Sequence, residues 1–487
     1  MTNIFNKKKS ILFQRIAFCF ATLVLTASCS PPKGDLSKLP TNDYADAEPQ
    51  VGQKLQRLIA KVKENPGDAA AWGMLGMNLH VHGFPDDAIA SFSEAYELDG
   101  EEFRWPYYAA FVALEKGDAS AFDWLLKARK VRENYAPLHV RIGEFLLKEQ
   151  RFDLARSAFE RAQRYDSRLS QAEHGLAKVA EAKGETRLAI DHAKNALRLN
   201  PRHHEAAALL RSLYRQAGDE QKSAQFGGGS APGTPVKMVE PLIGAMMLEG
   251  VSRYWYVLRG KDYLAAGKYV KAISELELAR GIKDGAEVNN DLGYCFLQLG
   301  KIDDATRYFA KAVEMAPNNA VYLGDYGNAL AKIGDPRGEK LMRKALDLVP
   351  GDPAVVSLAS QFYREKNRWL ETVDVYRRAH RADSDSYLFQ YNLAWFLAVS
   401  PDADARNPKE ALAVIEAMQK NTDLSHRDIL ELFSVVYAAN KDFPKALRYS
   451  QQAIARAAKT KNARLVQTLR RRHELFEKRV AWTLGMR

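Results

Sequence analysis

A repeat of 33 or 34 residues constrains this chain more than any other feature of its sequence. Two series of alanines keep this spacing: Ala95, Ala128, Ala162 and Ala196, and later Ala279, Ala312, Ala345 and Ala379. In the first series another alanine stands seven residues before each member, which puts small residues along one stripe of a helix. Self-similarity at such a period is typical of solenoids, in which each repeat packs against its neighbours.

Each period carries two helical patterns separated by a turn. The clearest unit has its signature residues at Leu292, Gly293, Phe296, Gly300, Lys301, Ala305, Phe309, Ala312 and Pro317. Small residues let two helices approach closely, an aromatic ring fills the gap, and proline stops the second helix. Chance alanine periodicity is the alternative, but two series with Gly and Pro in phase argue against it. This unit resembles the tetratricopeptide repeat consensus, and the resemblance implies an all-α superhelical solenoid of about ten helix-turn-helix repeats.

The repeats fall into two arrays. We expect an N-terminal array over 51–225, a Gly/Ser/Pro linker over 226–235, a C-terminal array over 236–455 and a basic capping helix over 456–487. Residues 242–248 are apolar on most sides. They predict a helix packed across the start of the second array, or alternatively a mobile plug or partner contact, since methionine adapts to varied surfaces.

The first residues are typical of an export signal. Lys7, Lys8, Lys9 and Arg15 precede an uncharged run that is too short to span a bilayer with ease. The run ends in Leu25-Thr26-Ala27-Ser28-Cys29, which resembles the lipobox of bacterial lipoproteins, although Thr26 departs from the usual aliphatic residue. A plain signal peptide cut nearby and an uncleaved anchor are the alternatives.

The lipobox resemblance implies a signal peptide over 1–28 and lipid attachment at Cys29. Ser30 follows, where an Asp would favour retention at the inner membrane, so the resemblance implies an outer-membrane protein that faces the periplasm. Residues 29–50 contain few large apolar side chains and predict a flexible tether.

The net charge of +11 is concentrated at the two ends of the chain. Residues 1–28 carry +4, residues 456–487 carry +8, and the remainder carries −1. A globally basic nucleic-acid binder is therefore disfavoured, and we predict no nucleic-acid partner. The basic tail predicts either a cap alone or a contact surface for anionic lipid or an acidic partner, and the two are compatible. The candidate residues are Arg470, Arg471, Arg472, Lys478 and Arg479.

The chain offers few candidates for catalysis. It lacks the sequence motifs of zinc proteases, P-loop nucleotide-binding proteins, serine hydrolases and Cys-x-x-Cys oxidoreductases. The His80/His82 and His203/His204 pairs have no third ligand nearby in sequence, and Cys295 is expected as a buried, inert thiol. We therefore predict no catalytic residue, no metal and no cofactor.

A solenoid of helix pairs presents a concave surface built from the first helix of each pair. The tetratricopeptide register places seven candidate partner-binding residues near that surface: Tyr254, Lys261, Asn290, Tyr294, Asn328, Gln361 and Arg364. Each could equally be an ordinary solvated side chain. Asn290 and Asn328 lack the lysines with which members of this family clamp a terminal carboxylate, so that ligand class is not supported.

A lipid-anchored solenoid is similar to the lipoproteins that help assemble pili, secretion pores or exopolysaccharide exporters. The resemblance implies a non-enzymatic scaffold that binds protein partners in the assembly or localisation of a pilus or secretion system. The alternative is an exopolysaccharide factor that binds glycan or a glycan-modifying enzyme, for which Trp255, Trp369 and Trp395 are the side chains to inspect. An enzyme of unrecognised type is a third hypothesis.

Overall fold

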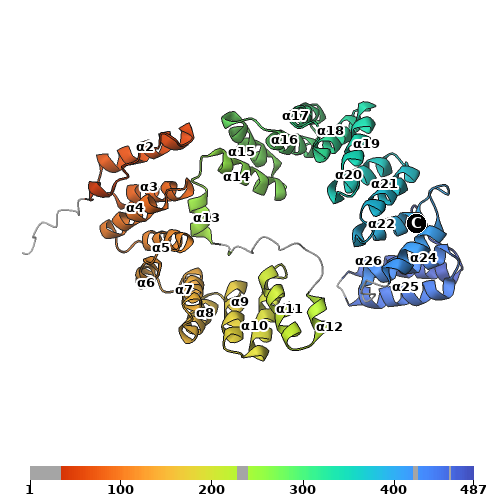
Figure 1. Ribbon diagram of the computed structural model, residues 1–487, viewed down its shortest axis with the longest axis horizontal. Helices are drawn as coiled ribbons and strands as arrows, with labels where there is room; N and C mark the ends of the chain where they lie inside the picture. Colours follow the sequence, from red (N-terminus) through yellow and green to blue (C-terminus); the bar gives the residue numbers. More distant parts are fainter. Residues whose placement is uncertain (1–33, 227–237, 239, 420–425, 460–461, 487) are drawn as a thin grey trace, which may run out of the picture. The chain divides into compact units, whose positions relative to one another are not determined.

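The computed structural model describes residues 34–226, 238, 240–419, 426–459 and 462–486, and within these ranges all regular secondary structure is helical (Figure 1). The predicted all-α solenoid of helix pairs is thereby confirmed. The chain divides into two compact units, Met1–Ser252 and Arg253–Arg487. Among the described residues, no helix is both long enough and apolar enough to cross a bilayer.

Unit 1 begins with a short 3-10 helix, η1 (Leu36–Lys38), and a single helix, α2 (Pro49–Glu64). Paired helices follow: α3 (Ala69–Val81) with α4 (Pro85–Leu98), α5 (Arg104–Lys116) with α6 (Ala121–Val131), α7 (Ala136–Lys148) with α8 (Phe152–Tyr165), α9 (Ser170–Ala182) with α10 (Thr186–Leu199), and α11 (His204–Gln216) with α12 (Glu220–Gln225). The seven-residue helix α13 (Pro241–Met247) ends the unit.

Unit 2 continues with the same design. Its pairs are α14 (Arg253–Ala265) with α15 (Tyr269–Ile282), α16 (Ala286–Gln298) with α17 (Ile302–Met315), α18 (Ala320–Lys332) with α19 (Arg337–Leu348), α20 (Pro353–Glu365) with α21 (Trp369–Ala382), α22 (Tyr387–Val399) with α23 (Pro408–Met418), and α24 (Arg427–Ala439) with α25 (Phe443–Ala458). A single helix, α26 (Ala463–Glu477), packs on α25. Within this unit the first helices lie on the inner side of the curve (Figure 1).

The ends of the helices follow from local sequence. The carboxylate of Asp68 caps α3 by accepting the backbone N–H groups of Ala70 and Ala71, and Asn319 caps α18 in the same way. Gly300 ends the turn after α16 with a φ of +74°, a conformation that residues with a side chain rarely adopt.

Small residues bring the two helices of a pair together. A Cβ atom added to Gly293 of α16 would lie 2.7 Å from the ring of Phe309 on α17, so only glycine fits there. Gly143 of α7 meets Phe159 of α8 at the same distance. All eight alanines of the two sequence series are fully buried. The repeat read from the sequence is therefore the core itself, as close packing requires.

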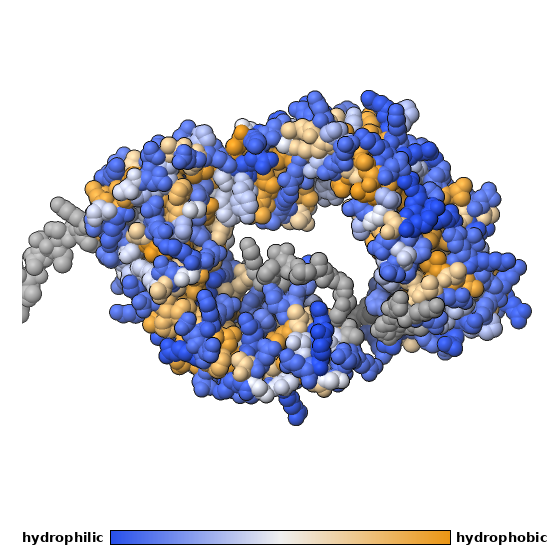
Figure 2. Space-filling model, viewed as in Figure 1, coloured by the Kyte–Doolittle hydropathy of each residue, from blue (hydrophilic) through white to orange (hydrophobic). Residues whose placement is uncertain are grey.

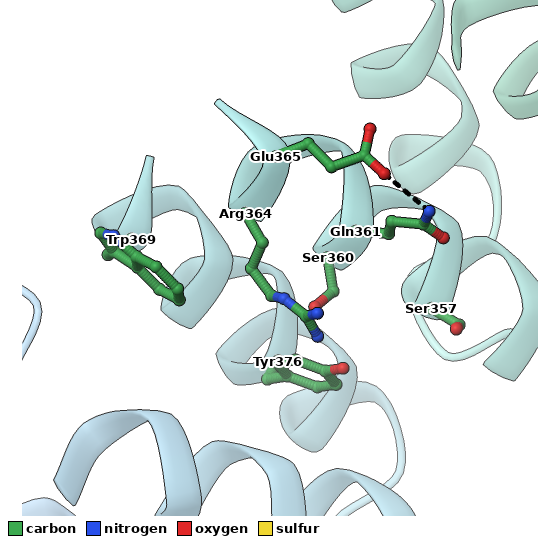
Figure 3. Close-up of a pocket in the computed structure, with 7 residues that line it drawn as sticks. All are labelled: Ser357, Ser360, Gln361, Arg364, Glu365, Trp369 and Tyr376. Carbon is green, nitrogen blue, oxygen red and sulfur yellow. Dashed lines mark hydrogen bonds between the residues drawn. The ribbon is translucent and has the colours of Figure 1, made fainter. Parts of the chain in front are cut away.

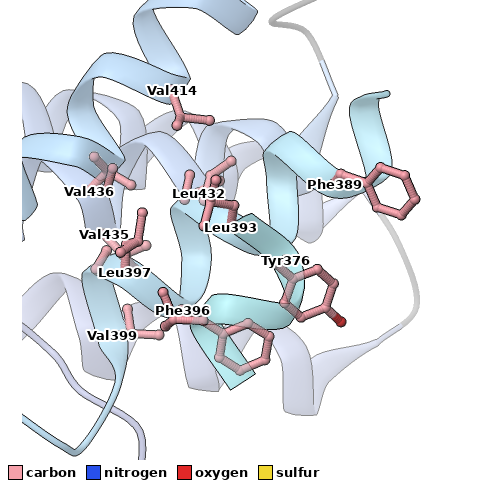
Figure 4. Close-up of a cluster of buried hydrophobic side chains, with 14 of the residues drawn as sticks. Tyr376, Phe389, Leu393, Phe396, Leu397, Val399, Val414, Leu432, Val435 and Val436 are labelled. Atoms are coloured by element: carbon pink, nitrogen blue, oxygen red, sulfur yellow. The ribbon is translucent and has the colours of Figure 1, made fainter. Parts of the chain in front are cut away.

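The largest apolar cluster of unit 2 lies toward its C-terminal end (Figure 4). Leu393 and Leu397 of α22 lie in this cluster with Leu432, Val435 and Val436 of α24. The helix α24 packs against α22, α23 and α25, and an unbroken run of its side chains is buried. This end of the array therefore has a core that surrounds a central helix rather than one apolar stripe per helix.

Residues 35–48 correct the prediction of a flexible tether over 29–50. The backbone N–H of Asp35 donates to the Glu94 carboxylate at 2.8 Å, and the Lys38 ammonium lies 2.7 Å from the same carboxylate. Tyr44 is buried against Phe84, with ring centroids 4.6 Å apart. The partners lie 40 to 59 residues away in the chain, which is why composition alone could not reveal this contact. Cys29 lies outside the described residues.

The helix α13 corrects a second prediction. It was expected to cover the start of the second array, but it packs against α3 in unit 1. It lies on the inner side of the curve that the helix pairs of unit 1 follow (Figure 1). The physical reason is that the acidic residue before it, Glu240, finds a buried basic partner on α7.

Candidate partner-binding surfaces

The residues predicted for the inner face of the second array all lie on first helices of its pairs. Tyr254 on α14 is 64% exposed and meets Trp255 edge to face, and Tyr294 on α16 is 37% exposed. Asn328 on α18 is half-buried. The aromatic rings that reach solvent here are the kind that pack against a partner's backbone or side chains.

Two of the predicted residues are held by neighbouring repeats. Lys261 on α14 forms an ion pair with Glu287 on α16. The side-chain amide of Asn290 on α16 donates to the Asp325 carboxylate on α18 at 3.0 Å. These contacts link consecutive first helices, so both residues contribute to the packing of the array as well as to its surface.

Two aspartates in the same region, one on α16 and one on α18, have raised pKa values. Burial raises the pKa of Asp291 to about 6, and burial also raises the pKa of Asp325. Glu287 adds to the shift of Asp291 because like charges disfavour ionisation. A raised pKa favours the neutral acid, so these two carboxyl groups carry less negative charge near neutral pH than exposed aspartates do.

Gln361 and Arg364 come together in a pocket between α20 and α21 (Figure 3). The pocket has a volume of about 360 Å³ and is lined by Ser357, Ser360, Gln361, Arg364, Glu365, Trp369 and Tyr376. Arg364 points toward Tyr376, while the amide of Gln361 donates to Glu365 at 2.7 Å (Figure 3). A guanidinium and amide beside aromatic rings can bind a carboxylate, a peptide carbonyl or a sugar hydroxyl.

A basic and aromatic site lies on the first helices of unit 1, and the sequence analysis missed it. Glu240, which is 7% exposed, pairs with Arg141 of α7 and accepts a hydrogen bond from the hydroxyl of Tyr107 on α5. The Arg141 Nε atom also donates to the Tyr107 hydroxyl at 3.1 Å. Burial disfavours the charge of Arg141, but Tyr107 and Glu240 outweigh it and raise the pKa of the guanidinium above its usual range.

A second set of contacts lies at the other end of α13. The Lys54 ammonium of α2 is 2.8 Å from the Glu249 carboxylate and 2.7 Å from the backbone carbonyl of the same residue. The backbone N–H of Val251 donates to Nε2 of His82 at 3.0 Å. The other ring nitrogen of His82 donates to the carbonyl of Asn78 at 2.7 Å, which leaves Nε2 free to accept.

The basic residues at the C-terminus differ in their surroundings. Arg470, Arg471, Lys478 and Arg479 are exposed. Arg472 is only partly exposed: it forms an ion pair with Glu431, and its guanidinium lies 3.9 Å from the ring centroid of Trp482 and 5.6 Å from that of Trp395. Arg472 therefore holds the end of the chain against α24, and the exposed four form the surface available for contact.

Burial shifts the pKa values of Cys295 and of three histidines that the sequence offered for catalysis or metal binding. Cys295 is buried, and burial raises the pKa of its thiol to about 12, which suppresses the reactive thiolate. Burial lowers the pKa of His80 to about 4 and also lowers those of His82 and His203. Within the described ranges, no cluster of three or more His, Cys, Asp or Glu side chains is arranged to hold a metal ion.

The sequence held a signal for the missed site in unit 1. Glu240 and Glu249 flank the apolar run on both sides, and acids at both ends of a short apolar helix indicate two anchoring points. Their partners lie 99 and 195 residues away, so no local pattern could identify them.

The surface gives no further extended apolar site on the face in view. Figure 2 shows hydrophilic side chains over most of that face, with apolar side chains in separate small patches. Single exposed apolar residues of this kind are normal and carry no functional meaning by themselves.

Comparisons with known proteins agree with this description. Residues 286–319, which form α16 and α17, match the tetratricopeptide repeat family model. No curated protein matches the chain at a significant level.

Two solved structures illustrate the likeness. Residues 41 to the end of MamA from Desulfovibrio magneticus RS-1 show 19% identity and a TM-score of 0.31, over 33% of this chain and 91% of that chain. Yeast Tom70 shows 13% identity and a TM-score of 0.37, over 84% of this chain and 96% of that chain.

One helix pair thus matches the family model, and helix pairs with a buried alanine at the same spacing recur in both units. The chain thus contains a match to the tetratricopeptide repeat over residues 286–319, within two arrays of helix pairs.

Proposed function

We propose that this protein is a non-enzymatic scaffold, anchored by lipid at Cys29 to the bacterial outer membrane, which binds protein partners in the periplasm. The partners belong to a cell-envelope assembly, a pilus or a secretion system. Tetratricopeptide arrays present a surface for protein partners, and the chain carries two of them. The export signal and the lipobox resemblance at the N-terminus support the location.

The observation that carries the proposal is the pocket between α20 and α21. Exposed Gln361 and Arg364 line it together with Trp369 and Tyr376, which supply aromatic surface. Interfaces commonly concentrate their binding energy in aromatic and arginine side chains of this kind. A peptide segment of a partner can thus place a carboxylate or a backbone carbonyl against Arg364 and an apolar side chain against the rings.

A site-specific crosslinking experiment tests this proposal. A photoreactive amino acid replaces Gln361 in the pocket, or Glu314 on the outward-lying second helix α17 as a matched control, and intact envelopes are irradiated. We expect a pilin or secretin subunit to be captured from position 361 and not from position 314. Equal capture from both positions, or capture of glycan enzymes alone, contradicts the proposal.

The glycan alternative rests on one feature of the same pocket. Trp369 lines the same pocket as the polar groups of Gln361 and Arg364, and sugar sites combine an aromatic face with hydrogen-bonding groups. Trp395, by contrast, packs against Trp482 and Arg472. Titration of the soluble protein with export polysaccharides, followed through tryptophan fluorescence, separates the two proposals: saturable quenching that Trp369→Phe abolishes favours the glycan.

The lipid anchor has its own test. Replacing Cys29 by Ser removes the acylation site, so we expect the protein to leave the membrane fraction and appear in the soluble periplasm. Retention of the Cys29→Ser protein on membranes contradicts the anchor, and the exposed basic residues of the C-terminal cap become the next candidates for membrane contact.

A further inference from the structure

The segment over residues 240–251 lies on the first helices of unit 1 in the way that a bound peptide lies in a groove. Its contacts come from α2, from the C-terminal end of α3, and from α5 and α7. In tetratricopeptide arrays these first helices form the partner-binding surface. The chain therefore places its own segment where an external ligand would bind.

Acidic residues anchor this segment at both ends. Glu240 pairs with Arg141 and Tyr107 at one end, and Glu249 pairs with Lys54 at the other, with the side-chain amide of Asn78 at 3.4 Å. The basic groups of the array are thus matched by the acids of the segment. A charge pattern of this kind selects a partner and sets its register.

Backbone groups of the segment are recognised as well. The hydroxyl of Tyr108 donates to the carbonyl of Leu242 at 3.1 Å, Lys54 donates to the carbonyl of Glu249, and His82 accepts from the N–H of Val251. Hydrogen bonds from side chains to an extended or helical main chain are the means by which grooves hold peptides whose side chains vary.

The segment itself has little internal stability. The helix α13 has seven residues, and helices of this length are marginal in water unless something holds them. Of its apolar side chains only Met246 is fully buried, while Leu248, just beyond the helix, is 61% exposed. Its order thus depends on a few anchors, and regions with few buried apolar contacts open at low free-energy cost.

We propose that residues 240–251 are a displaceable internal occupant of the groove of the first array. The external ligand of that groove is a protein segment of the same chemistry, a short apolar helix with a carboxylate at each end. The identity of this ligand rests on the proposed role as a protein-binding scaffold; the displacement of the internal segment does not.

Tethering makes the competition quantitative. A segment held in the same chain is present at an effective concentration of the order of millimolar, so an external peptide of equal intrinsic affinity competes poorly. Neutralising the acids of the internal segment removes this competitor while every side chain of the groove stays intact. The apparent affinity for an added peptide is then expected to rise at least tenfold.

A peptide-binding experiment on the full chain tests the proposal. The probe is a synthetic peptide of residues 240–252 with an N-terminal fluorophore, and binding is followed by fluorescence anisotropy. The unmodified chain is compared with the Glu240→Gln/Glu249→Gln chain. We expect at least tenfold tighter binding to the substituted chain, and at least tenfold weaker binding of a control peptide in which both acids are glutamine.

Matched substitutions place the binding in the groove. Arg141→Gln, added to the substituted chain, is expected to weaken peptide binding at least tenfold, whereas Arg307→Gln, at an exposed position on the second helix α17 of unit 2, leaves it unchanged. Equal binding to the unmodified and the substituted chains contradicts the claim that the internal segment competes with the peptide. If the substituted chain is folded by circular dichroism but does not bind the peptide, the claim that the groove binds such a peptide is wrong.

Hydrogen exchange on the unmodified chain keeps the proposal testable if the substituted chain does not fold. The amides of α13 are expected to exchange at least tenfold faster than those of α5, because α13 opens alone. Exchange of both helices at one common rate shows that the segment is a fixed part of unit 1 and overturns the proposal. Neither result depends on partner capture at position 361. That experiment tests the role as a scaffold through unit 2, so the two proposals can fail separately.

Discussion

The two arrays have the same core and differ on the surface that their first helices present. In unit 1 this surface is basic and aromatic, and the acids Glu240 and Glu249 of the same chain bind to it. In unit 2 the corresponding helices carry exposed Tyr254 and Tyr294, and the polar pocket around Arg364. Helix pairs of the same design thus form two different surfaces. In unit 1 a segment of the chain itself covers the surface, whereas in unit 2 the named side chains are exposed within their unit.

The difference comes from a few outward-facing side chains. The buried alanines of the core are shared because the two helices of each pair must approach closely. The outward positions are under no such constraint, so the two arrays can carry different side chains there without disturbing the fold. Function in such a protein is carried by positions that the repeat pattern leaves undetermined.

The largest expected effect tests the shared core. Phe159→Ala in unit 1 and Phe309→Ala in unit 2 each remove a fully buried ring that packs on a glycine. Each is expected to lower the free energy of unfolding of its own unit by about 3 to 5 kcal/mol. Urea denaturation measures this loss of stability. The control is Leu154→Ala, at a largely exposed position. A much smaller cost in one unit would show that the two cores are not equivalent.

A second substitution tests the difference between the surfaces. Glu240→Gln leaves Arg141 buried without its counter-charge, and we expect the docking of α13 to weaken by about 2 to 3 kcal/mol. Glu287→Gln in unit 2 removes a half-exposed ion pair with Lys261 and is expected to cost less than about 1 kcal/mol. Hydrogen exchange of α13, and urea denaturation for unit 2, measure the two effects. Equal losses in the two variants would show that the buried ion pair of unit 1 is no more important than the half-exposed ion pair of unit 2.

The basic C-terminal residues offer a comparison within unit 2. Arg472→Ala deprives Glu431 of its ion pair and Trp482 of its stacked guanidinium, and is expected to destabilise this end of the array by about 2 kcal/mol. Arg471→Ala, at an exposed position, is expected to change stability by less than about 0.5 kcal/mol. Thermal melting of the two variants decides this, and similar shifts would show that Arg472 does not hold the chain end.

The smallest expected effect is a pH dependence of the docking of α13 in unit 1. Burial lowers the pKa of His82, which accepts from Val251 in its neutral form while Lys54, Glu48 and Glu249 contribute charge around it. An undocked histidine binds a proton as the pH falls below about 6.5, which the docked one resists. Docking is therefore favoured above this pH and weakens below it, by at most about 1.4 kcal/mol per pH unit.

Exchange of the α13 amides between pH 7 and 5.5, corrected for the intrinsic dependence of exchange on pH, measures this effect. His82→Gln retains an acceptor that does not titrate, so its docking is expected to lose this dependence. A dependence that persists in His82→Gln assigns the effect to another group.

Much of the fold was predictable from the sequence. The spacing of Ala95, Ala128 and their later counterparts predicted the helix pairs and both arrays, because a repeated close contact requires a small residue at the same place in every period. The positions of Tyr254, Gln361 and Arg364 on first helices followed from the same register. These properties are local, because the residues that determine them lie within one repeat of 33 or 34 residues.

The contacts between distant segments were not predictable in this way. The docking of Glu240 on Arg141, of Glu249 on Lys54 and of Asp35 on Glu94 joins residues 59 to 195 positions apart. The pocket of Arg364 needed Trp369 and Tyr376 of the next helix to become a site. Charge composition did not reveal these contacts, because an acid near an apolar run is compatible with solvent until a buried base is placed beside it.

The sequence by itself thus determined the helix pair, its repetition and the residues that pack it, since packing at one fixed period leaves a pattern that can be read along the chain. Only the tertiary structure decided which inner surface the chain occupies itself. That choice depends on the buried pairing of Glu240 with Arg141, and the stability of a buried charge is set by the neighbours that the fold brings to it.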